Sequence, residues 1–506
     1  MTPSIAKPAV RTPWNAQSWL SLLLGTALLP FATLYTIIPV AAWLAPVFLL
    51  RFSRTQPLAV ALPVVVLAQV LGTFGTLRTD YFDPPMSPAM LAGFCLGYGL
   101  LLALPYIADR LLAQRLFGRG LVLAFPLALT TLHWLLSFSP FPTWGSPAYT
   151  QVGNLPLVQL VSLTGLWGLV FLMAWLASAV NAAWEERFSA DGLRRYALPF
   201  VLVLVAVLLY GGARLAFAPT PQTVRVAGLA PNPQLWSYPP VQQIAAASQL
   251  ERDAFRQKVQ PGLQDLFTRT ELEARAGAKL VVWAETAAWV VQEDEAVVLE
   301  RARRVAQQEG IYLQVGMGVI NRTPSHPYAT NYSLLFDPQG RVLWNYHKAY
   351  PVPIGDAAEI EPGERAVPIV DTPLGRWAGI ICFDGNTLSF VRQAGQARVD
   401  VMLIPADDWR QNRFDHAHSH FFRAVENGFS LVRPTAKGYS VATDAYGRML
   451  ASTDYFATSQ PTIIANVPTK GVSTLYAQIG DVLAYLAVAG LAVLLGLAVY
   501  RERGRA

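Results

Sequence analysis

The chain has 506 residues, of which 53% are hydrophobic and only 14% are charged, and its mean hydropathy is +0.33. This composition excludes an ordinary soluble globular protein and indicates a membrane protein. The net charge of +6 is uneven, since residues 222–468 carry −2 and the remainder carries +8, so the basic balance belongs to the membrane part and predicts no nucleic-acid partner.

Long apolar runs alternate with short polar loops before residue 221, and one more apolar run follows residue 468. A run of about 20 apolar residues is long enough to cross a bilayer as a helix. The pattern therefore predicts a polytopic α-helical membrane domain with about eight spans. The predicted spans lie at 18–36, 37–50, 57–77, 88–107, 120–138, 155–184, 196–217 and 480–500.

The basic residues of the membrane part are concentrated in alternate loops. If the N-terminus is cytoplasmic, 13 of them face the cytoplasm, and only Arg78, Arg214 and Lys470 face outside. The positive-inside rule therefore predicts that both termini are cytoplasmic. The 13 basic residues lie in the N-terminal tail, in the loops at 51–56, 108–119 and 185–195, and in the C-terminal tail.

This topology divides the chain into three parts. Residues 1–221 are predicted to form a membrane domain with seven transmembrane helices, and residues 469–506 to form the last transmembrane helix with a short cytoplasmic tail. Residues 222–468 are then an extracytoplasmic domain, where strand-like and helix-like stretches alternate as in an αββα sandwich. Strands are expected at 224–229, 279–283, 312–318, 331–336, 341–346, 377–382, 399–404, 430–434, 438–443 and 462–467, and helices at 245–260, 263–276, 294–309, 386–397 and 415–427.

One predicted strand ends on a cysteine. The apolar run from Trp377 to Ile381 is typical of a buried strand, and Cys382 follows it directly. Gly385 allows a turn, and Asn386 is placed to cap the helix predicted after it. A thiol beside a helix N-terminus lies in a positive potential that favours the thiolate. An isolated cysteine is more often a small buried hydrophobe, so its assignment as a nucleophile depends on two other segments.

Two further predicted strands end beside ionisable side chains. Glu285 follows a buried-looking run, and a carboxylate there can take a proton from a thiol. Lys348 follows the strand predicted at 341–346, where an ammonium group can stabilise an oxyanion together with the backbone N–H after the cysteine. Each residue alone is as readily a solvated side chain at a strand end, so only the combination with Cys382 indicates a catalytic site.

The order Glu285, Lys348, Cys382, each at or just after a strand end, resembles the nitrilase (carbon-nitrogen hydrolase) superfamily over nearly all of residues 222–468. Spans ahead of such a domain, with one more behind it, resemble the apolipoprotein N-acyltransferase family, bacterial enzymes that complete lipoprotein acylation. Further segments that resemble this superfamily or family lie at 141–151, 165–172, 405–409, 423–427 and 473–481.

The chain departs from that family beside the three residues. Where the family has Leu-Val-Pro-Phe-Gly-Glu after the lysine, this chain has Pro-Val-Pro-Ile-Gly-Asp, ending at Asp356, and where it has Tyr-Glu after the cysteine, this chain has Phe383 and Asp384. Each change from Glu to Asp shortens the side chain by one methylene, and a misplacement of about 1 Å can cost about a hundredfold in rate. Phe383, Asp384 and Asp356 are predicted to support the three central residues with altered geometry.

The resemblance implies a reaction in two steps. Glu285 would deprotonate Cys382, and the thiolate would attack an acyl ester of a membrane phospholipid while Lys348 and the Phe383 N–H stabilise the oxyanion. The resulting thioester would acylate the diacylglyceryl-cysteine at the N-terminus of an apolipoprotein. The resemblance also implies a monomer in the bacterial cytoplasmic (inner) membrane, with its catalytic domain on the periplasmic side and no cofactor.

Four aromatic residues of the predicted loops, Trp236, Tyr238, Trp289 and Tyr350, are expected to contact the lipid substrates. Two other functions fit the same residues. A membrane-tethered nitrilase-like amidase or hydrolase would pass the acyl group to water, and a non-catalytic lipoprotein-binding homologue would not form a thioester.

Three histidines lie close together in the helix predicted at 415–427. His416 and His420 share a face of that helix, but the only acid nearby on that stretch is Asp415. This donor set is poor for a structural or catalytic metal, so no metal site is predicted, and His416, His418 and His420 are expected to be solvated or packed.

Overall fold

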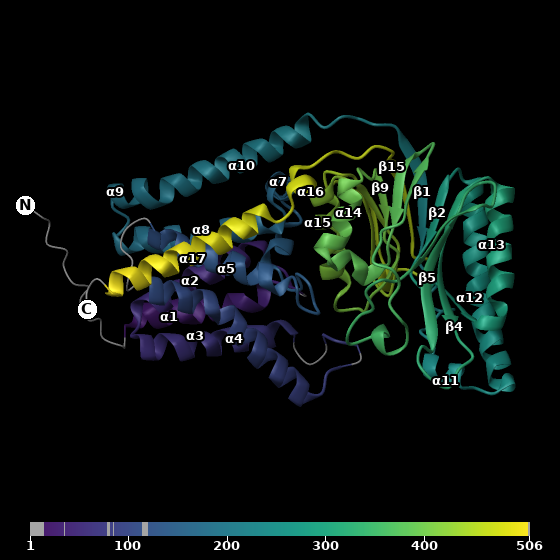
Figure 1. Ribbon diagram of the computed structural model, residues 1–506, viewed down its shortest axis with the longest axis horizontal. Helices are drawn as coiled ribbons and strands as arrows, with labels where there is room; N and C mark the ends of the chain where they lie inside the picture. The colour runs from purple at the N-terminus through teal and green to yellow at the C-terminus, as the bar shows by residue number, and fades with distance from the viewer. Residues whose placement is uncertain (1–14, 35, 78–80, 84, 114–119, 504–506) are drawn as a thin grey trace, which may run out of the picture.

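A computed structural model of the protein describes residues 15–34, 36–77, 81–83, 85–113 and 120–503. Figure 1 shows an elongated molecule with a helical bundle at one end and an α/β part at the other. The last long helix of the chain returns from the α/β part and lies along the bundle. Six basic residues used to predict the orientation lie outside the described residues: Lys7, Arg11, Arg78, Arg115, Arg119 and Arg505.

The bundle has helices at all eight predicted spans, and five stretches are long and apolar enough to cross a membrane: 58–77, 88–112, 166–185, 190–216 and 482–503. The helices at the other three spans, α1, α2 and α5, have 13, 17 and 17 residues. The chain is therefore a membrane protein. The helices are α1 (Ala16–Leu28), α2 (Pro39–Thr55), α3 (Leu58–Leu77), α4 (Pro88–Ala113), α5 (Gly120–Leu136), α6 (Leu155–Val158), α7 (Val161–Thr164), α8 (Leu166–Glu185), α9 (Ala190–Gly192), α10 (Leu198–Ala216) and α17 (Val482–Arg503).

The helix predicted at 155–184 is not continuous. It is broken at Gly165, between α7 and α8, where φ is +63°. Glycine is required there for two reasons: L-residues avoid this conformation, and an added Cβ would lie 2.4 Å from the ring of Tyr476. The prediction of one helix was wrong because the packing of Tyr476 is not visible in the local sequence.

The α/β part contains two main sheets. One has the order β15-β1-β2-β4-β5-β6, with β3 paired to β4, and the other has the order β14-β13-β11-β9-β8-β7. Four pairs of inner strands are parallel, namely β1 with β2, β2 with β4, β8 with β9, and β9 with β11. The strands are β1 (Thr223–Leu229), β2 (Leu280–Trp283), β3 (Ala288–Val291), β4 (Tyr312–Ile320), β5 (Ala329–Phe336), β6 (Val342–His347), β7 (Ile369–Thr372), β8 (Gly375–Gly379), β9 (Val401–Leu403), β10 (Ala406–Asp407), β11 (Ser430–Arg433), β12 (Thr435–Ala436), β13 (Tyr439–Thr443), β14 (Met449–Asp454) and β15 (Thr462–Pro468).

Helices cover both outer faces of the paired sheets, so the predicted αββα sandwich is confirmed. α12 and α13 lie on the face away from the bundle, whereas α14 and α15 lie between the second sheet and the bundle (Figure 1). The two helices predicted at 245–260 and 263–276 are largely one helix, which continues through Pro261. The helices of this part are α11 (Val241–Ala245), α12 (Gln249–Arg275), α13 (Glu295–Glu309), α14 (Leu388–Gln396), α15 (Arg413–Asn427) and α16 (Leu475–Ile479).

The bundle and the α/β part share one apolar core. Leu388 of α14 and Phe421, Phe422 and Val425 of α15 belong to the same buried cluster as the core residues of α2 and α8. The ring centroids of Tyr149 and Phe422 lie 5.3 Å apart. α15 is therefore packed between the second sheet and the membrane helices, which brings the residues at its N-terminal end close to the loops of the bundle.

Candidate active site

The residues predicted as Glu–Lys–Cys lie just beyond the ends of three strands. Glu285 follows β2, Lys348 follows β6, and Cys382 follows β8 of the opposite sheet. All three side chains are buried, with 3%, 2% and 2% of their surface exposed. The two sheets of the sandwich thus bring together residues that are far apart in the sequence.

Cys382 begins a 3-10 turn, Cys382–Asn386, rather than ending a strand. Its φ of +49° lies in the left-handed region, which costs a non-glycine residue about 1–2 kcal/mol. β8 ends at Gly379, so the predicted strand was three residues too long. The prediction that Asn386 caps the next helix was also wrong, because Thr387 occupies the N-cap position of α14.

Strained backbone recurs around the same site. Thr286, the residue after Glu285, has φ of +44°, and Lys437, whose Nζ lies 3.3 Å from Asp407, has φ of +46°. Such conformations persist only where the surrounding structure fixes them, and they are common at functional sites.

The Glu285 carboxylate accepts hydrogen bonds from three donors. Lys348 Nζ and Asn331 Nδ2 donate to Oε1 at 2.8 and 2.7 Å, and the backbone N–H of Asp407 donates to Oε2 at 2.7 Å. Lys348 Nζ also lies 2.6 Å from Oδ2 of Asp356. The backbone carbonyl of Asp407 accepts from Cys382 Sγ at 3.6 Å, so the backbone of one residue contacts both the thiol and the carboxylate. Lys348 therefore lies between two carboxylates, Glu285 and Asp356, and the two ion pairs hold all three side chains in position.

The expected thiolate is not favoured in the resting site. Burial and then the charge of Glu285 raise the pKa of Cys382 well above its usual value, although Lys348 lowers it. The prediction from the helix N-terminus was wrong because it omitted the cost of burying a charge and the neighbouring carboxylate. Burial also opposes the charge of Lys348, but Asp356 and Glu285 outweigh it and raise the pKa of Lys348 well above normal. Sulfur therefore needs a base before it can attack.

The two shorter carboxylates both reach partners. Asp356 Oδ1 accepts from the Val352 N–H at 2.6 Å, which holds its other oxygen against Lys348. Asp384 accepts from Tyr346 Oη at 2.7 Å and from the N–H groups of Ile381 and Tyr350 at 2.9 and 2.7 Å. Burial raises the pKa of Asp384 to about 7, although these hydrogen bonds oppose the rise. Asp384 thus ties the turn at Cys382 to β6.

Phe383 lies in the same turn and faces the bundle. Its ring centroid lies 6.4 Å from that of Phe141, in the loop before α6. The contact joins the cysteine turn to one of the segments that resembled the acyltransferase family.

A second polar group also lies beside the sulfur. The ligand atoms of Cys382, Asp408 and His416 all lie within 4.8 Å of one another. His416 Nδ1 lies 2.6 Å from Asp408, and Arg433 donates to both Asp408 oxygens at 3.1 and 2.9 Å. Arg433 Nε also donates to His420 Nδ1 at 2.8 Å. Because Asp408 is already paired with Arg433, this group is a hydrogen-bond network rather than a free metal-binding set.

Sequence reasoning did not assign roles to the residues of this network. Asp408 was noticed only within the segment 405–409, and His416 was expected to be solvated or packed. The shared helix face of His416 and His420 is confirmed, since their ring centroids are 4.4 Å apart. The signal that was missed is Arg433, a buried cation at the end of a predicted strand, which needs an acidic partner.

A cavity opens at Cys382 between the α/β part and the bundle. Cys382, Phe383, Asp408, Asp415 and His416 line it from one side. Residues of the bundle and its loops complete it: Phe82, Phe141, Pro142, Thr143, Trp144 and Tyr149. The thiol is therefore reached from the boundary with the membrane helices.

The four aromatic residues predicted to contact lipid lie elsewhere. Tyr238 Oη donates to Glu359 at 2.7 Å, and its ring centroid is 5.2 Å from that of Trp289. Trp236 lies near them, with Lys437 Nζ 5.7 Å from its ring. Tyr350 packs on Phe390 at 5.4 Å. The described lining of the cavity at Cys382 includes none of the four, so contact with substrate remains a prediction.

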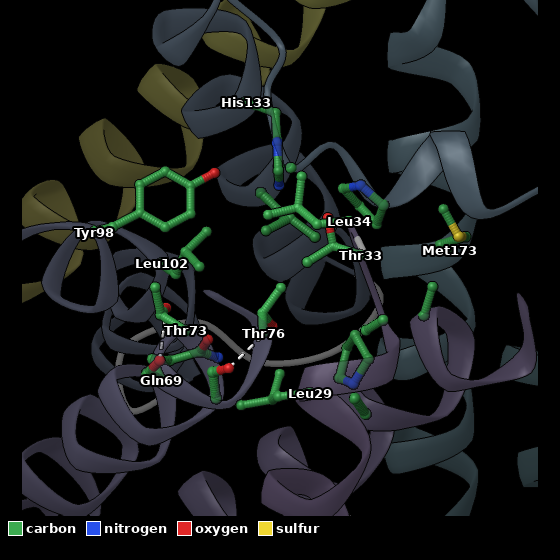
Figure 2. A pocket seen from close by; sticks show the side chains of 18 of the residues that line it. Leu29, Thr33, Leu34, Gln69, Thr73, Thr76, Tyr98, Leu102, His133 and Met173 are labelled. Carbon is green, nitrogen blue, oxygen red and sulfur yellow. Dashed lines mark hydrogen bonds between the residues drawn. The ribbon is translucent and has the colours of Figure 1, made fainter. Parts of the chain in front are cut away.

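A second, apolar cavity lies inside the helical bundle. Figure 2 shows that Leu29, Leu34, Leu102 and Met173 surround it together with a few polar side chains. Two of the polar groups are satisfied within their own helix, since Thr73 donates to Gln69 O at 2.8 Å and Thr76 donates to Gly72 O at 3.0 Å. Trp144 lines both cavities, so they approach each other at this residue.

Known proteins match both parts of the chain. The carbon-nitrogen hydrolase family matches residues 244–476. An apolipoprotein N-acyltransferase of Geobacter metallireducens is 28% identical over 76% of this chain and 75% of its own, and one of Bradyrhizobium diazoefficiens is 24% identical over 81% and 79%. The crystal structure of an amidase from Nesterenkonia sp. covers 53% of this chain and 98% of the amidase, at 19% identity and a TM-score of 0.40. The matches across the helical bundle and the hydrolase domain together support the assignment of the chain to the apolipoprotein N-acyltransferases, which it resembles over both of its parts.

Proposed function

We propose that the protein is an N-acyltransferase that moves an acyl chain from a membrane phospholipid to the N-terminal diacylglyceryl-cysteine of apolipoproteins. The observation that carries the proposal is the charge cluster beside the thiol: Glu285 and Lys348 are ion-paired at 2.8 Å, and the backbone N–H and C=O of Asp407 contact Glu285 and Cys382 respectively. The relatives that span both parts of the chain carry the same activity in their names.

In the first step, Glu285 takes the proton of Cys382, and Sγ attacks the carbonyl carbon of the phospholipid ester. Lys348 Nζ and the Phe383 N–H stabilise the tetrahedral oxyanion. The C–O bond then breaks, the glycerol oxygen takes the proton from Glu285, and lysophospholipid leaves. A thioester remains on Cys382. The thiol is protonated at rest because its pKa is raised, so a base has to remove its proton. Glu285 has this role.

In the second step, the α-amine of the acceptor first loses a proton to solvent if it enters as ammonium, and the neutral amine then attacks the thioester carbon. The C–N bond forms and the C–S bond breaks. Glu285 takes a proton from the attacking nitrogen and returns it to sulfur, which restores the thiol. The enzyme ends as it began, and the acyl chain is held in an amide.

We propose that the catalytic domain lies on the periplasmic side of the bacterial inner membrane, as a monomer with both termini in the cytoplasm. The charge of the loops supports this orientation. The apolar cavity in the bundle suits one acyl chain of a lipid substrate, because it offers a largely apolar lining beside the cavity at Cys382.

The test is mass spectrometry of the intact protein after incubation with phospholipid vesicles. We expect an adduct of one acyl chain on Cys382 and its loss when a diacylated lipopeptide is added, with the chain recovered as an amide. Release of fatty acid or ammonia without amide would favour the amidase or hydrolase. The lipoprotein-binding homologue would be favoured if no adduct forms and if the Cys382→Ala protein still restores growth to a strain that lacks the gene for this protein.

A further inference from the structure

The cavity at Cys382 presents a different set of groups from the catalytic cluster. Asp408, Asp415 and His416 line it with Cys382, whereas Glu285 and Lys348 are not among its described lining residues. A molecule that occupies the cavity next to the sulfur therefore contacts the N-terminal end of α15. The chemistry of this wall indicates what such a molecule is.

Asp415 is a buried carboxylate with an unused oxygen. It is 4% exposed, lines the cavity, and its Oδ1 has no hydrogen-bond partner among the described residues. Burying an unpartnered carboxylate is costly unless a ligand supplies the missing charge or donor. Burial and the nearby Asp408 charge raise the pKa of Asp415 to about 7, which agrees with a site that lacks its counter-ion.

The other charged groups of this wall are already balanced. Asp408 is paired with Arg433 through both oxygens, and Asp407, which also lines the cavity, lies 3.3 Å from Lys437 Nζ. Burial lowers the pKa of His416, which favours the neutral imidazole. The negative charge of Asp415 is therefore the one that no described side chain of the wall neutralises.

Aromatic rings also line the cavity. Phe82 and Trp409 stack with ring centroids 6.3 Å apart, and Trp144 lies 6.2 Å from Phe82. Aromatic faces attract organic cations and also accept apolar chains. A carboxylate and aromatic rings in one cavity suit an ammonium group attached to an apolar molecule.

We propose that Asp415 binds a primary ammonium group of a lipid substrate next to Cys382. The proposal rests on the acyltransferase function and names a binding residue for it. Two sources carry this chemistry: the α-amine of the lipidated acceptor and the aminoethyl headgroup of a phospholipid donor. The two sources act in different steps, so one experiment separates them.

The experiment uses the full chain with Asp415→Asn, in vesicles of phosphatidylethanolamine or of phosphatidylglycerol. Thioester formation and its discharge by a diacylated lipopeptide are measured by mass spectrometry. If the acceptor binds Asp415, discharge slows about thirtyfold or more, while formation is unchanged with both lipids. If the donor headgroup binds, formation slows only with phosphatidylethanolamine. In either case Asp415→Glu should recover part of the lost rate.

Two controls separate binding from a structural defect. Hydroxylamine is a small neutral nucleophile, and it should discharge the thioester of Asp415→Asn at the wild-type rate. Asp253→Asn, on α12 at the far face of the sheet, changes the net charge equally and should alter neither step. Wild-type rates in both steps for Asp415→Asn, or equal slowing with lipopeptide and hydroxylamine, would overturn the proposal. A wild-type protein without any thioester would overturn the acyltransferase function itself.

Discussion

Two buried carboxylates of the active-site region have opposite surroundings. Glu285 accepts three hydrogen bonds from Lys348, Asn331 and the Asp407 N–H, so both of its oxygens are occupied. Asp415 is equally buried but leaves Oδ1 without a described partner. The fully bonded carboxylate is held in position for proton transfer, whereas the other has room for a ligand. The difference teaches that burial alone does not define the role of an acid in this site.

The sharpest way to break this comparison is Glu285→Gln. The variant keeps the size of the side chain but removes the base, so thioester formation should fall about a thousandfold. Asp415→Asn should leave this step at the wild-type rate with phosphatidylglycerol as donor. Single-turnover accumulation of the acyl adduct measures both. Equal losses in that step would show that the two carboxylates act as one unit.

Lys348→Met should have the next largest effect. It leaves Glu285 and Asp356 close together without their cation, which should cost about 3–5 kcal/mol of stability. The loss of an oxyanion donor should also slow thioester formation about a hundredfold to a thousandfold. Thermal unfolding in detergent gives the first effect and adduct formation the second.

Asp415→Asn is the matched control for stability, since it removes a buried acid that has no cation beside it. The folded state raises the pKa of Asp415 from 3.8 to about 7. A raised acid pKa means that the folded protein loses stability as the pH rises from about 4 to 7. Removing that acid should leave the melting temperature at pH 8 unchanged or higher, not lower. A fall as large as that of Lys348→Met would contradict the contrast between a paired and an unpaired charge.

The titration of the thiol gives a smaller but more specific effect. Burial and Glu285 raise the pKa of Cys382, so Glu285→Gln removes a negative charge and should lower it, while Lys348 then favours the thiolate more strongly. The thiolate absorbance should therefore appear at lower pH in Glu285→Gln than in the wild type, with Cys382→Ala as the blank. An unchanged or higher midpoint would refute the assigned electrostatics.

The smallest effect is expected from a change in the apolar cavity of the bundle, whose described lining includes neither Glu285 nor Asp415. Ala174 of α8 is fully buried and lines that cavity. Ala174→Leu narrows it, so the enzyme should prefer shorter donor chains by about tenfold in kcat/KM. Competition between donors of two chain lengths measures the ratio. An unchanged ratio would show that the acyl chain lies elsewhere.

The three central residues were predictable because each follows a strand with a clear apolar pattern. The apolar patterns locate the strand ends, and the order of Glu285, Lys348 and Cys382 resembles that of the carbon-nitrogen hydrolases, in which such residues from two sheets form one site. The raised pKa of the thiol was not predictable in the same way. It depends on burial and on the Glu285 charge across the two sheets, which no window of sequence around Cys382 contains.

The unpredicted features share one cause, which is contact between distant segments. Asp408 and Arg433 are 25 residues apart in the sequence and lie in different elements. Gly165 interrupts an apolar run that looked continuous, because Tyr476 packs on it. Five strands were missed: β3 and β7 have four residues each and β10 and β12 have two each, too few to show an alternating pattern, and none of the six residues of β14 is buried. Local patterns located the elements, and the packing between them set their ends and their partners.

The apolar core shared by α15 and the bundle links biogenesis to activity. Phe421, Phe422 and Val425 pack in one cluster with α8, and the Leu166 N–H that starts α8 donates to Glu426 at 2.9 Å. Because α8 precedes α15 in the chain, the apolar surface that buries these three side chains is synthesised before they are. An error in the assembly of the bundle would therefore expose them and remove the support of the helix that carries Asp415 and His416.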